Sequence, residues 1–376
     1  MKIVTTIKWA QAKGGAERSG LDVASGLRHK GNDVTVLYRG GEDLLPAYRA
    51  AGCKVRKAHD FVVDPTRRFP SSIGLVRTTV AAIPDWPDLV YCQDYQHLPF
   101  GGALAATTRA SLVCHLRLLP PVNRSGRQIR IVIPRVDRFI AVSDDTRTRW
   151  AQAGLPKERI DVVHNGIDLS MFSPGSPEDR RKAREHAGLT DEDYAIVYVG
   201  RIDHPKGVHI LVEAASRFAE EHPNARLLLV GQPIWHDTEQ DGLNYIAELR
   251  QLAGKMRIDF VGHQFDLVPY YRAADVVVTP STWPEPFGRV VIEAMACGAP
   301  VIASDIGGIP EILSGELSEF LVTPGDPEAL VRRLEQVYAV DSTQLGQRFR
   351  AEAEARFGFD RTLEGIWACM KAERQA

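Results

Sequence analysis

Cysteine is scarce in this sequence, and what there is of it does not pair. Five cysteines are spread over 376 residues, and no two stand in the Cys-x-x-Cys spacing of a zinc or redox site. An odd, scattered set of thiols in apolar surroundings is typical of a reducing compartment. The sequence therefore argues against a disulfide framework and against a structural zinc site.

Long apolar runs and a strong net charge are also missing. The first residues, MKIVTTI, lack the apolar core of a signal peptide, and no run approaches the roughly 18 apolar residues of a membrane span. The formal net charge is −2, so no overall field favours nucleic acid as a partner. We therefore expect a cytoplasmic protein that does not bind nucleic acid.

What is present is a repeated alternation of short apolar runs and helical patterns. The runs are rich in Val, Ile and Leu and mostly do not alternate with polar residues, as expected of parallel strands covered on both faces. Strands are predicted near 2–7, 33–37, 88–92, 111–115, 137–143 and 160–163, and in a second series near 195–199, 226–230, 258–261, 275–280 and 300–303. Helices are predicted at 16–29, 178–186, 287–297 and 359–376.

Two successive series of this kind predict an α/β protein with two Rossmann-like domains. A stretch rich in Pro, Gly and Ser at 168–177 separates them. The first domain is predicted to cover 1–171, the second 172–356, and the last helix, 357–376, to pack back on the first. Ligands of such folds bind at the carboxyl ends of the strands, so we expect the site in the cleft between the domains.

The clearest motif in the second half contains two glutamates eight positions apart, Glu285 and Glu293. Glu293 has apolar neighbours on its predicted helix, and a carboxylate there needs hydrogen-bond donors such as ribose hydroxyls. The backbone amides around Phe287 and Gly288, at the start of that helix, suit an anionic oxygen. The alternative is a capping glutamate followed by a solvated one.

Two further motifs follow predicted strands in the same half. Arg201 and Lys206 stand five residues apart on a loop bounded by Gly200 and Gly207, which suits a diphosphate, although a plain surface charge pair would look the same. A Gly-Gly pair at 307–308 lets backbone amides approach a ligand, or forms an ordinary turn.

The first half has fewer distinctive motifs. Gly14 and Gly15 follow the first strand and open a helix, but they do not form the G-x-G-x-x-G pattern, which argues against a dehydrogenase. Polar residues follow two other strands, and they are candidates for binding an acceptor or are structural: Asp94, His97, His115 and Arg117.

These motifs together resemble the retaining family-4 glycosyltransferases, which have the two-domain GT-B fold. Residues 280–294 are similar to the family's E-x7-E signature, 199–207 to its Gly-Arg…Lys-Gly loop, and 306–311 to its Gly-Gly-x-Pro-Glu string. The resemblance implies that Glu285 lies by the donor sugar and that Glu293 holds the ribose. It also implies that Arg201 and Lys206 neutralise the leaving diphosphate.

The same resemblance gives roles to several weaker positions. It places Gly14 and Gly15 near the donor phosphates and the loop containing Gly262 and His263 beside the nucleobase. It makes His115 a catalytic candidate near the donor sugar and the acceptor. Many members continue with Asp after that histidine, whereas this chain continues with Leu116 and Arg117.

The reaction implied is transfer of a sugar from a nucleoside-diphosphate sugar with retained anomeric configuration, without a metal or other cofactor. The sugar, the base, the acceptor and the oligomeric state stay open. A sugar-nucleotide epimerase and a non-catalytic binding subunit of the same fold are the alternatives.

An arginine-rich stretch at 117–138 is the remaining feature. Its six arginines stand against Asp137 alone. It predicts a peripheral contact with an anionic membrane face, a site for a phosphorylated acceptor, or a solvated surface.

Overall fold

The computed structural model describes residues 1–11, 15–62, 68–121, 127–233 and 239–372. The chain divides into two compact units, Met1–Asn165 with Asp360–Ala376, and Gly166–Phe359. Residues 166–171, which the sequence assigned to the first domain, belong to the second unit, because Ile167 forms a parallel bridge with Gly358 there.

The first unit is built on a seven-stranded parallel sheet with the order β3-β2-β1-β4-β5-β6-β7. Its strands are β1 (Lys2–Trp9), β2 (Asp33–Gly40), β3 (Lys54–Lys57), β4 (Leu89–Cys92), β5 (Ser111–Leu116), β6 (Arg138–Ala141) and β7 (Ile160–Val162). The central strand β4 is buried along its whole length, as its continuous apolar sequence predicts.

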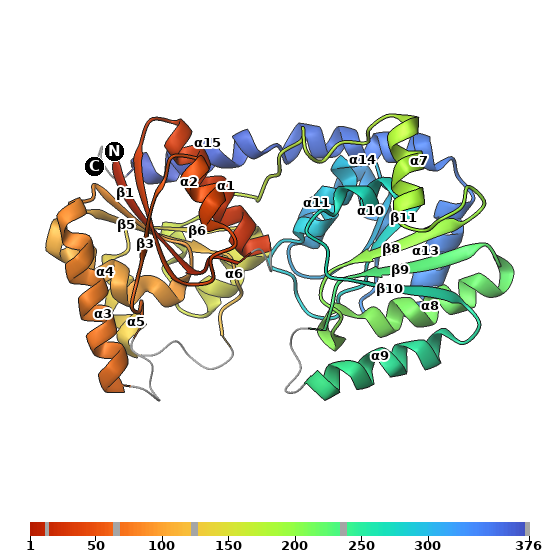
Figure 1. Cartoon of the computed structure of the whole chain (residues 1–376), viewed down its shortest axis with the longest axis horizontal. Helices are drawn as coiled ribbons and strands as arrows, with labels where there is room; N and C mark the ends of the chain where they lie inside the picture. Colours follow the sequence, from red (N-terminus) through yellow and green to blue (C-terminus); the bar gives the residue numbers. More distant parts are fainter. Residues whose placement is uncertain (12–14, 63–67, 122–126, 234–238, 373–376) are drawn as a thin grey trace. The chain divides into compact units, whose positions relative to one another are not determined.

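Helices cover both faces of this sheet, with α1 and α2 on one face and α3, α4 and α5 on the other (Figure 1). The α-helices are α1 (Gly15–His29), α2 (Leu45–Ala50), α3 (Arg68–Ala82), α4 (Leu98–Thr108), α5 (Arg127–Val132), α6 (Asp144–Gln152) and α15 (Phe359–Ala372). Short 3-10 helices are η1 (Ile83–Asp85), η2 (Tyr95–His97), η3 (Ile133–Arg135) and η4 (Lys157–Arg159).

The second unit has a six-stranded parallel sheet with the order β10-β9-β8-β11-β12-β13. Its strands are β8 (Tyr194–Val199), β9 (Ala225–Val230), β10 (Arg257–Gly262), β11 (Val276–Thr279), β12 (Val301–Ser304) and β13 (Leu321–Val322). Its helices are α7 (Pro177–His186), η5 (His204–Lys206), α8 (Val208–Glu221), α9 (Glu239–Ala253), α10 (Val268–Ala273), α11 (Arg289–Ala296), α12 (Ile309–Ile312), η6 (Gly315–Phe320), α13 (Pro327–Tyr338) and α14 (Ser342–Arg356).

The prediction of an α/β protein with two Rossmann-like domains is confirmed. Every strand predicted from the sequence is present, with ends shifted by no more than a few residues. Two strands were not predicted, β3 and β13. Strand β3 reads Lys-Val-Arg-Lys, an edge strand with too few apolar residues to be recognised, and β13 has only two residues.

The chain crosses from one unit to the other twice, after Asn165 and after Phe359. Hydrogen bonds within each unit join the segments next to these two crossings. In the first unit the Thr362 hydroxyl donates to the carbonyl of His164 at 2.8 Å. In the second unit the amide of Ile167 donates to the carbonyl of Phe357 at 2.9 Å. The last helix, α15, therefore completes the first unit after the chain has formed the second.

None of the helices in the described ranges is both long enough and apolar enough to cross a bilayer.

Candidate functional site

In the second unit, the loops that follow β8 and β11 bring two charged side chains of the sequence motifs together. The Lys206 ammonium, on η5, donates a hydrogen bond to Oε1 of Glu285. The Ser281 hydroxyl donates to the same oxygen at 2.6 Å. Since both loops leave the carboxyl ends of neighbouring strands, the pair lies at the sheet edge where ligands of this fold bind.

The surroundings of Glu285 keep it ionised despite its burial. Burial on its own raises the pKa of this carboxyl, but the Lys206 charge and hydrogen bond, the Ser281 hydroxyl and the charge of Arg201 together hold its pKa below the usual value. The Lys206 side chain keeps 24% of its surface exposed, so its ammonium remains accessible to an anion.

Arg201 is placed close to this pair by the start of the same loop. Its guanidinium Nη2 lies 3.3 Å from Oδ2 of the buried Asp203, and the Tyr198 hydroxyl donates to its backbone carbonyl. Asp203 also caps η5, because its Oδ1 accepts from the amide of Lys206 at 3.0 Å. One aspartate therefore contacts the Arg201 guanidinium and fixes the backbone of Lys206.

Gly207 allows the β8 loop to touch the β11 loop. Its φ of +67° is left-handed, and a Cβ at this position would lie 1.9 Å from the carbonyl oxygen of Pro280. The amide of Thr282 in turn donates to the carbonyl of Pro205 at 3.0 Å. The two loops form one connected surface, which explains why the sequence has Gly directly after Lys206.

The Gly-Gly pair after β12 supports the backbone of Glu285. Gly308 donates its amide to the carbonyl of Glu285 at 2.8 Å. Gly307 has a φ of +64°, and a Cβ there would lie 2.3 Å from the same carbonyl oxygen. Of the two sequence interpretations, a turn or a ligand contact, the structure accounts for the glycines as a turn that packs on Glu285.

Glu293 lies on α11 and is only 5% exposed. Its Oε2 accepts from the Tyr271 hydroxyl at 2.9 Å, and its Oε1 accepts from Nε of Arg289 at 2.8 Å. The sequence predicts ligand hydroxyls as its donors and does not reveal these two partners. Arg289 is four positions before Glu293 on the same helix, a spacing that favours an ion pair. No sequence signal connects Tyr271, on α10, with Glu293.

The other donor-side candidates of this unit lie at helix and strand ends. Phe287 is buried and its ring packs 5.9 Å from that of Phe357, so its side chain belongs to the core. Gly288 is the N-cap of α11 with a φ of +106°. Gly262 ends β10, and the ring of the following His263 lies 4.9 Å from that of Phe265. Their roles toward a donor stay predictions.

In the first unit, His115 is completely buried at the end of β5. Its Nδ1 is 2.5 Å from the Tyr91 hydroxyl, and its Nε2 has no hydrogen-bond partner. Burial, with a smaller effect of the Arg117 charge, holds its pKa well below the usual value. At neutral pH the imidazole is therefore neutral, with one ring N–H that can donate a hydrogen bond and one ring nitrogen that can accept one, and it does not act as an imidazolium acid.

Arg117 is also buried, with 8% of its surface exposed. Its Nη1 donates to the Ser19 hydroxyl, while Nε and Nη2 have no hydrogen-bond partner. A buried guanidinium with two unsatisfied N–H groups is energetically costly unless an acceptor reaches it.

Asp94 and His97 both have structural partners around η2. Asp94 caps this short helix by accepting from the amide of Gln96 at 2.8 Å, and burial raises its pKa. His97 is 3% exposed, its Nδ1 is 2.8 Å from the Thr6 hydroxyl, and burial lowers its pKa to about 3. The cap explains Asp94 without an acceptor, whereas the buried Nε2 of His97 has no hydrogen-bond partner. The binding role of both residues stays a prediction.

Two sequence features remain to be located. Gly14 lies outside the described residues, and Gly15 is the first residue of α1. The arginines that the structure describes in the stretch 117–138 differ in their surroundings: Arg117 is buried, Arg138 lies 3.8 Å from Asp161, and Arg130 and Arg135 are exposed.

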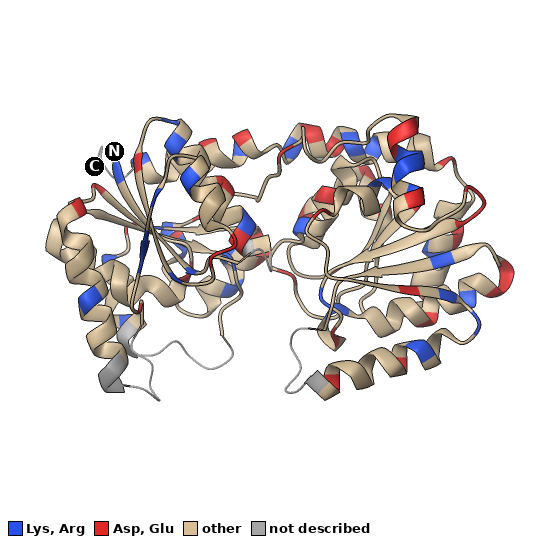
Figure 2. Ribbon diagram, in the orientation of Figure 1, with Lys and Arg blue, Asp and Glu red and all other residues tan. Residues whose placement is uncertain are grey.

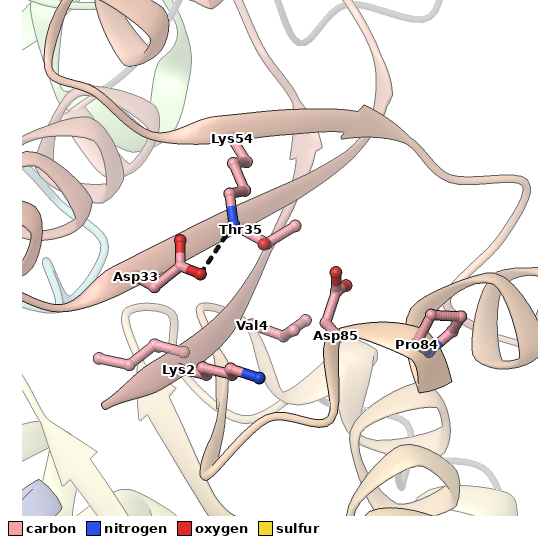
Figure 3. Close-up of a pocket in the computed structure, with 8 residues that line it drawn as sticks. Lys2, Val4, Asp33, Thr35, Lys54, Pro84 and Asp85 are labelled. Carbon is pink, nitrogen blue, oxygen red and sulfur yellow. Dashed lines mark hydrogen bonds and ion pairs between the residues drawn. The ribbon is translucent and has the colours of Figure 1, made fainter.

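A pocket in the first unit is lined by none of the candidate residues of that unit. It is at the amino ends of β1, β2 and β3 and is lined by residues such as Lys2, Asp33, Lys54 and Asp85 (Figure 3). Lys54 already pairs with Asp33 at 2.7 Å. Because ligands of these folds bind at the opposite edge of the sheet, this pocket is not the candidate site.

Comparisons with known proteins match both units. The family model for glycosyl transferases group 1 matches residues 179–356, and that for glycosyltransferase family 4 matches residues 13–171. The D-inositol 3-phosphate glycosyltransferase of Mycobacterium tuberculosis is 31% identical over 340 residues, which cover 83% of this chain and 68% of the relative.

Solved structures give the same result. Anabaena HepE in complex with UDP-glucose has a TM-score of 0.84 at 26% identity, over 99% of this chain and 100% of that chain. Sucrose-phosphate synthase from Thermosynechococcus elongatus has a TM-score of 0.80 at 23% identity, over 100% of this chain and 98% of that chain.

Proposed function

The chain belongs to glycosyltransferase family 4, with the two Rossmann-like domains of the GT-B fold, and from this premise we propose that it transfers a sugar from a nucleoside-diphosphate sugar to an acceptor hydroxyl with retention of anomeric configuration. The observation that carries the proposal is the cluster at the ends of β8 and β11. There Lys206 is hydrogen-bonded to an ionised Glu285, and Arg201 is close enough to influence that carboxylate.

In the proposed reaction the acceptor oxygen attacks C1 of the sugar on the face from which the diphosphate leaves. The bond between C1 and the diphosphate oxygen breaks as the new C1–O bond forms, and the proton of the acceptor hydroxyl passes to the leaving phosphate. Negative charge develops on that phosphate, and Arg201 and Lys206 stabilise it as preorganised cations. Glu285 holds Lys206 in position and lies by the donor sugar.

Glu293 is the proposed ribose-binding group of the donor site. Its carboxylate is fixed by Tyr271 and Arg289, and each of its oxygens keeps a further lone pair for a ribose hydroxyl. Since HepE was crystallised with UDP-glucose, we take a uridine diphosphate sugar as the first donor to test. Nucleotide sugars of this kind are cytoplasmic metabolites, so we propose that the protein works in the cytoplasm.

On the acceptor side, the proposal assigns Arg117 to an anionic group of the acceptor. Its two N–H groups without partners are the support for this assignment. The name of the mycobacterial relative contains a phosphorylated acceptor, D-inositol 3-phosphate. A phosphorylated polyol is therefore the first acceptor class to test, with the neutral polyol as its control.

We also propose that the reaction needs no divalent metal, because Arg201 and Lys206 supply the positive charge that a metal would bring. Activity in excess EDTA and proton NMR of the early product test the two claims separately. Retained configuration and undiminished turnover are expected. An inverted product overturns the mechanism, whereas retention with loss of activity in EDTA overturns only the account of charge neutralisation. Incubation with donor alone distinguishes an epimerase, which would change the sugar.

A further inference from the structure

Helix α3 in the first unit exposes aliphatic side chains on one side while it buries two hydroxyls on the other. Ile73, Val76 and Val80, spaced three and four residues apart on one side of the helix, are 45%, 60% and 59% exposed. On the inner side, Thr78 and Thr79 are 3% and 9% exposed. A surface helix normally places its aliphatic side chains toward the core and its hydroxyls toward water.

The buried threonines show that this arrangement is stable and not a sign of misplaced residues. The Thr78 hydroxyl donates to the carbonyl of Gly74 at 2.9 Å, and the Thr79 hydroxyl donates to the carbonyl of Leu75 at 2.9 Å. Both hydroxyls have acceptors within the helix, so their burial leaves no donor unsatisfied. The aliphatic side chains on the opposite side remain in contact with water, and a group of exposed aliphatic side chains indicates a binding partner.

Two further apolar side chains are exposed in this part of the first unit. Trp86, directly after η1, is 58% exposed, and Ile131 on α5 is 61% exposed. Helix α4 contacts both α3 and α5, so the three helices form one layer over the sheet. We call the exposed side chains of this layer, Ile73, Val76, Val80, Trp86 and Ile131, the α3 face.

The exposed charged side chains described on this layer are arginines. Arg77 on α3, Arg109 at the end of α4 and Arg130 on α5 are exposed, in a chain whose formal net charge is −2. The nearby aspartates are engaged locally: Asp85 pairs with Arg56, Asp88 accepts from the amide of Lys2, and Asp94 caps η2. Figure 2 shows blue but no red along α3, where Arg77 is exposed between Val76 and Val80.

From this combination we propose that the α3 face binds the surface of an anionic lipid bilayer. Aliphatic side chains and a tryptophan enter the interfacial region, and the arginines contact the acidic headgroups. A nucleic acid would use the arginines but would gain little from Ile73, Val76 and Val80. The proposal concerns a surface of the first unit and does not depend on the transfer reaction.

Cosedimentation of the full chain with vesicles tests this directly. Vesicles of phosphatidylglycerol with phosphatidylcholine are compared with phosphatidylcholine alone. The test variant carries Ile73→Ser, Val76→Ser and Val80→Ser. Its matched control carries Leu243→Ser, Leu252→Ser and Val340→Ser, three aliphatic residues of the second unit that are 56%, 41% and 51% exposed. Arg77→Glu is paired with Arg332→Glu, another exposed arginine.

The wild type and both controls are expected to bind the anionic vesicles and not the neutral ones. The triple α3 variant should bind on the order of tenfold more weakly, and Arg77→Glu at least about fivefold more weakly, with the largest difference at low salt. If a variant that binds vesicles more weakly has the same thermal unfolding midpoint as the wild type, it is still folded.

The proposal is overturned if the wild type ignores anionic vesicles or if the triple α3 variant binds them as the wild type does. It is also overturned if light scattering shows a wild-type dimer that the same three substitutions convert to a monomer. In that case a second copy of the chain covers this face.

Discussion

Lys206 and Glu285 are 79 positions apart in the chain, yet the ammonium of the first is hydrogen-bonded to the carboxylate of the second. The contact fixes a flexible lysine before any ligand binds, so its positive charge is already in place. In the proposed reaction, a diphosphate would share an existing cation and would not have to order one. Preorganisation of this kind is the main source of electrostatic catalysis.

The first prediction concerns this cation. Lys206→Ala should lower turnover on the order of 100-fold, equivalent to about 3 kcal/mol, because a charged donor at the developing anion is lost. Arg201→Ala should have a similar effect. Lys255→Ala, which removes an exposed lysine of the same unit, is the control and should behave as the wild type. Steady-state kinetics with a saturating donor measure this, and near-normal turnover in both site variants would contradict the assignment.

The second prediction separates the two glutamates. Glu293→Gln should weaken binding of the nucleoside diphosphate about tenfold, because it disturbs the group proposed to hold the ribose. Tyr271→Phe removes one hydrogen bond to Glu293 and should cost about fivefold, or roughly 1 kcal/mol. Glu285→Gln should leave this affinity almost unchanged and reduce turnover.

Isothermal titration with the diphosphate, followed by kinetics with the sugar donor, distinguishes these effects. Equal losses of diphosphate affinity in Glu285→Gln and Glu293→Gln would refute the division of roles. An unchanged affinity in Tyr271→Phe would show that Arg289 alone is sufficient to orient Glu293.

The third prediction uses two glycines with the same backbone conformation. Gly307 and Gly315 have φ of +64° and +60°, but a Cβ at Gly307 would meet the Glu285 carbonyl at 2.3 Å, whereas one at Gly315 would meet open space. Gly315→Ala should cost about 1 kcal/mol of stability from backbone strain alone. Gly307→Ala should cost more and also reduce turnover, because it displaces Glu285.

Urea denaturation and turnover measured on both variants test this pair. If Gly307→Ala retains full turnover, the turn does not position Glu285.

The fourth prediction follows from the buried neutral His97, whose pKa is about 3 in the folded protein. Below a pH of about 6.5 the unfolded chain binds a proton at this histidine that the folded chain excludes, so stability falls as pH falls. Between pH 7 and 5 this residue alone should cost about 2 kcal/mol. His97→Asn keeps a polar group near the Thr6 hydroxyl but cannot be protonated.

Urea denaturation of the wild type and His97→Asn at the two pH values measures the effect as a difference, so that other titrating groups cancel. The variant should lose about 2 kcal/mol less than the wild type over this range. Equal losses would show that His97 is accessible to protons in the folded state.

The sequence predicted the fold well because parallel strands buried on both faces leave a simple apolar pattern. Strand β4, with the sequence Leu-Val-Tyr-Cys, is an example. Strand β3 was missed because an edge strand needs few apolar residues, and β13 because two residues make no pattern. The hydrophobic pattern also did not predict the orientation of α3, where two valines are exposed and two threonines are buried.

The candidate site was predicted in part. Local spacing identified Arg201 with Lys206 and Glu285 with Glu293, because each pair lies on one loop or at one helix start. The contact between Lys206 and Glu285, the support of Glu285 by Gly307 and the bond from Tyr271 to Glu293 join separate elements. Such contacts depend on how the strands are ordered, which spacing along the chain does not encode.

The return of α15 to the first unit has a consequence for biosynthesis. Residues 166–359 form a continuous unit that is synthesised before residues 360–376, although the latter belong to the unit that contains Met1. The unit whose synthesis starts first therefore gains its last helix only after the whole second unit has been made. A purified fragment that stops at Phe359 should hold a protease-resistant second unit beside an incomplete first one.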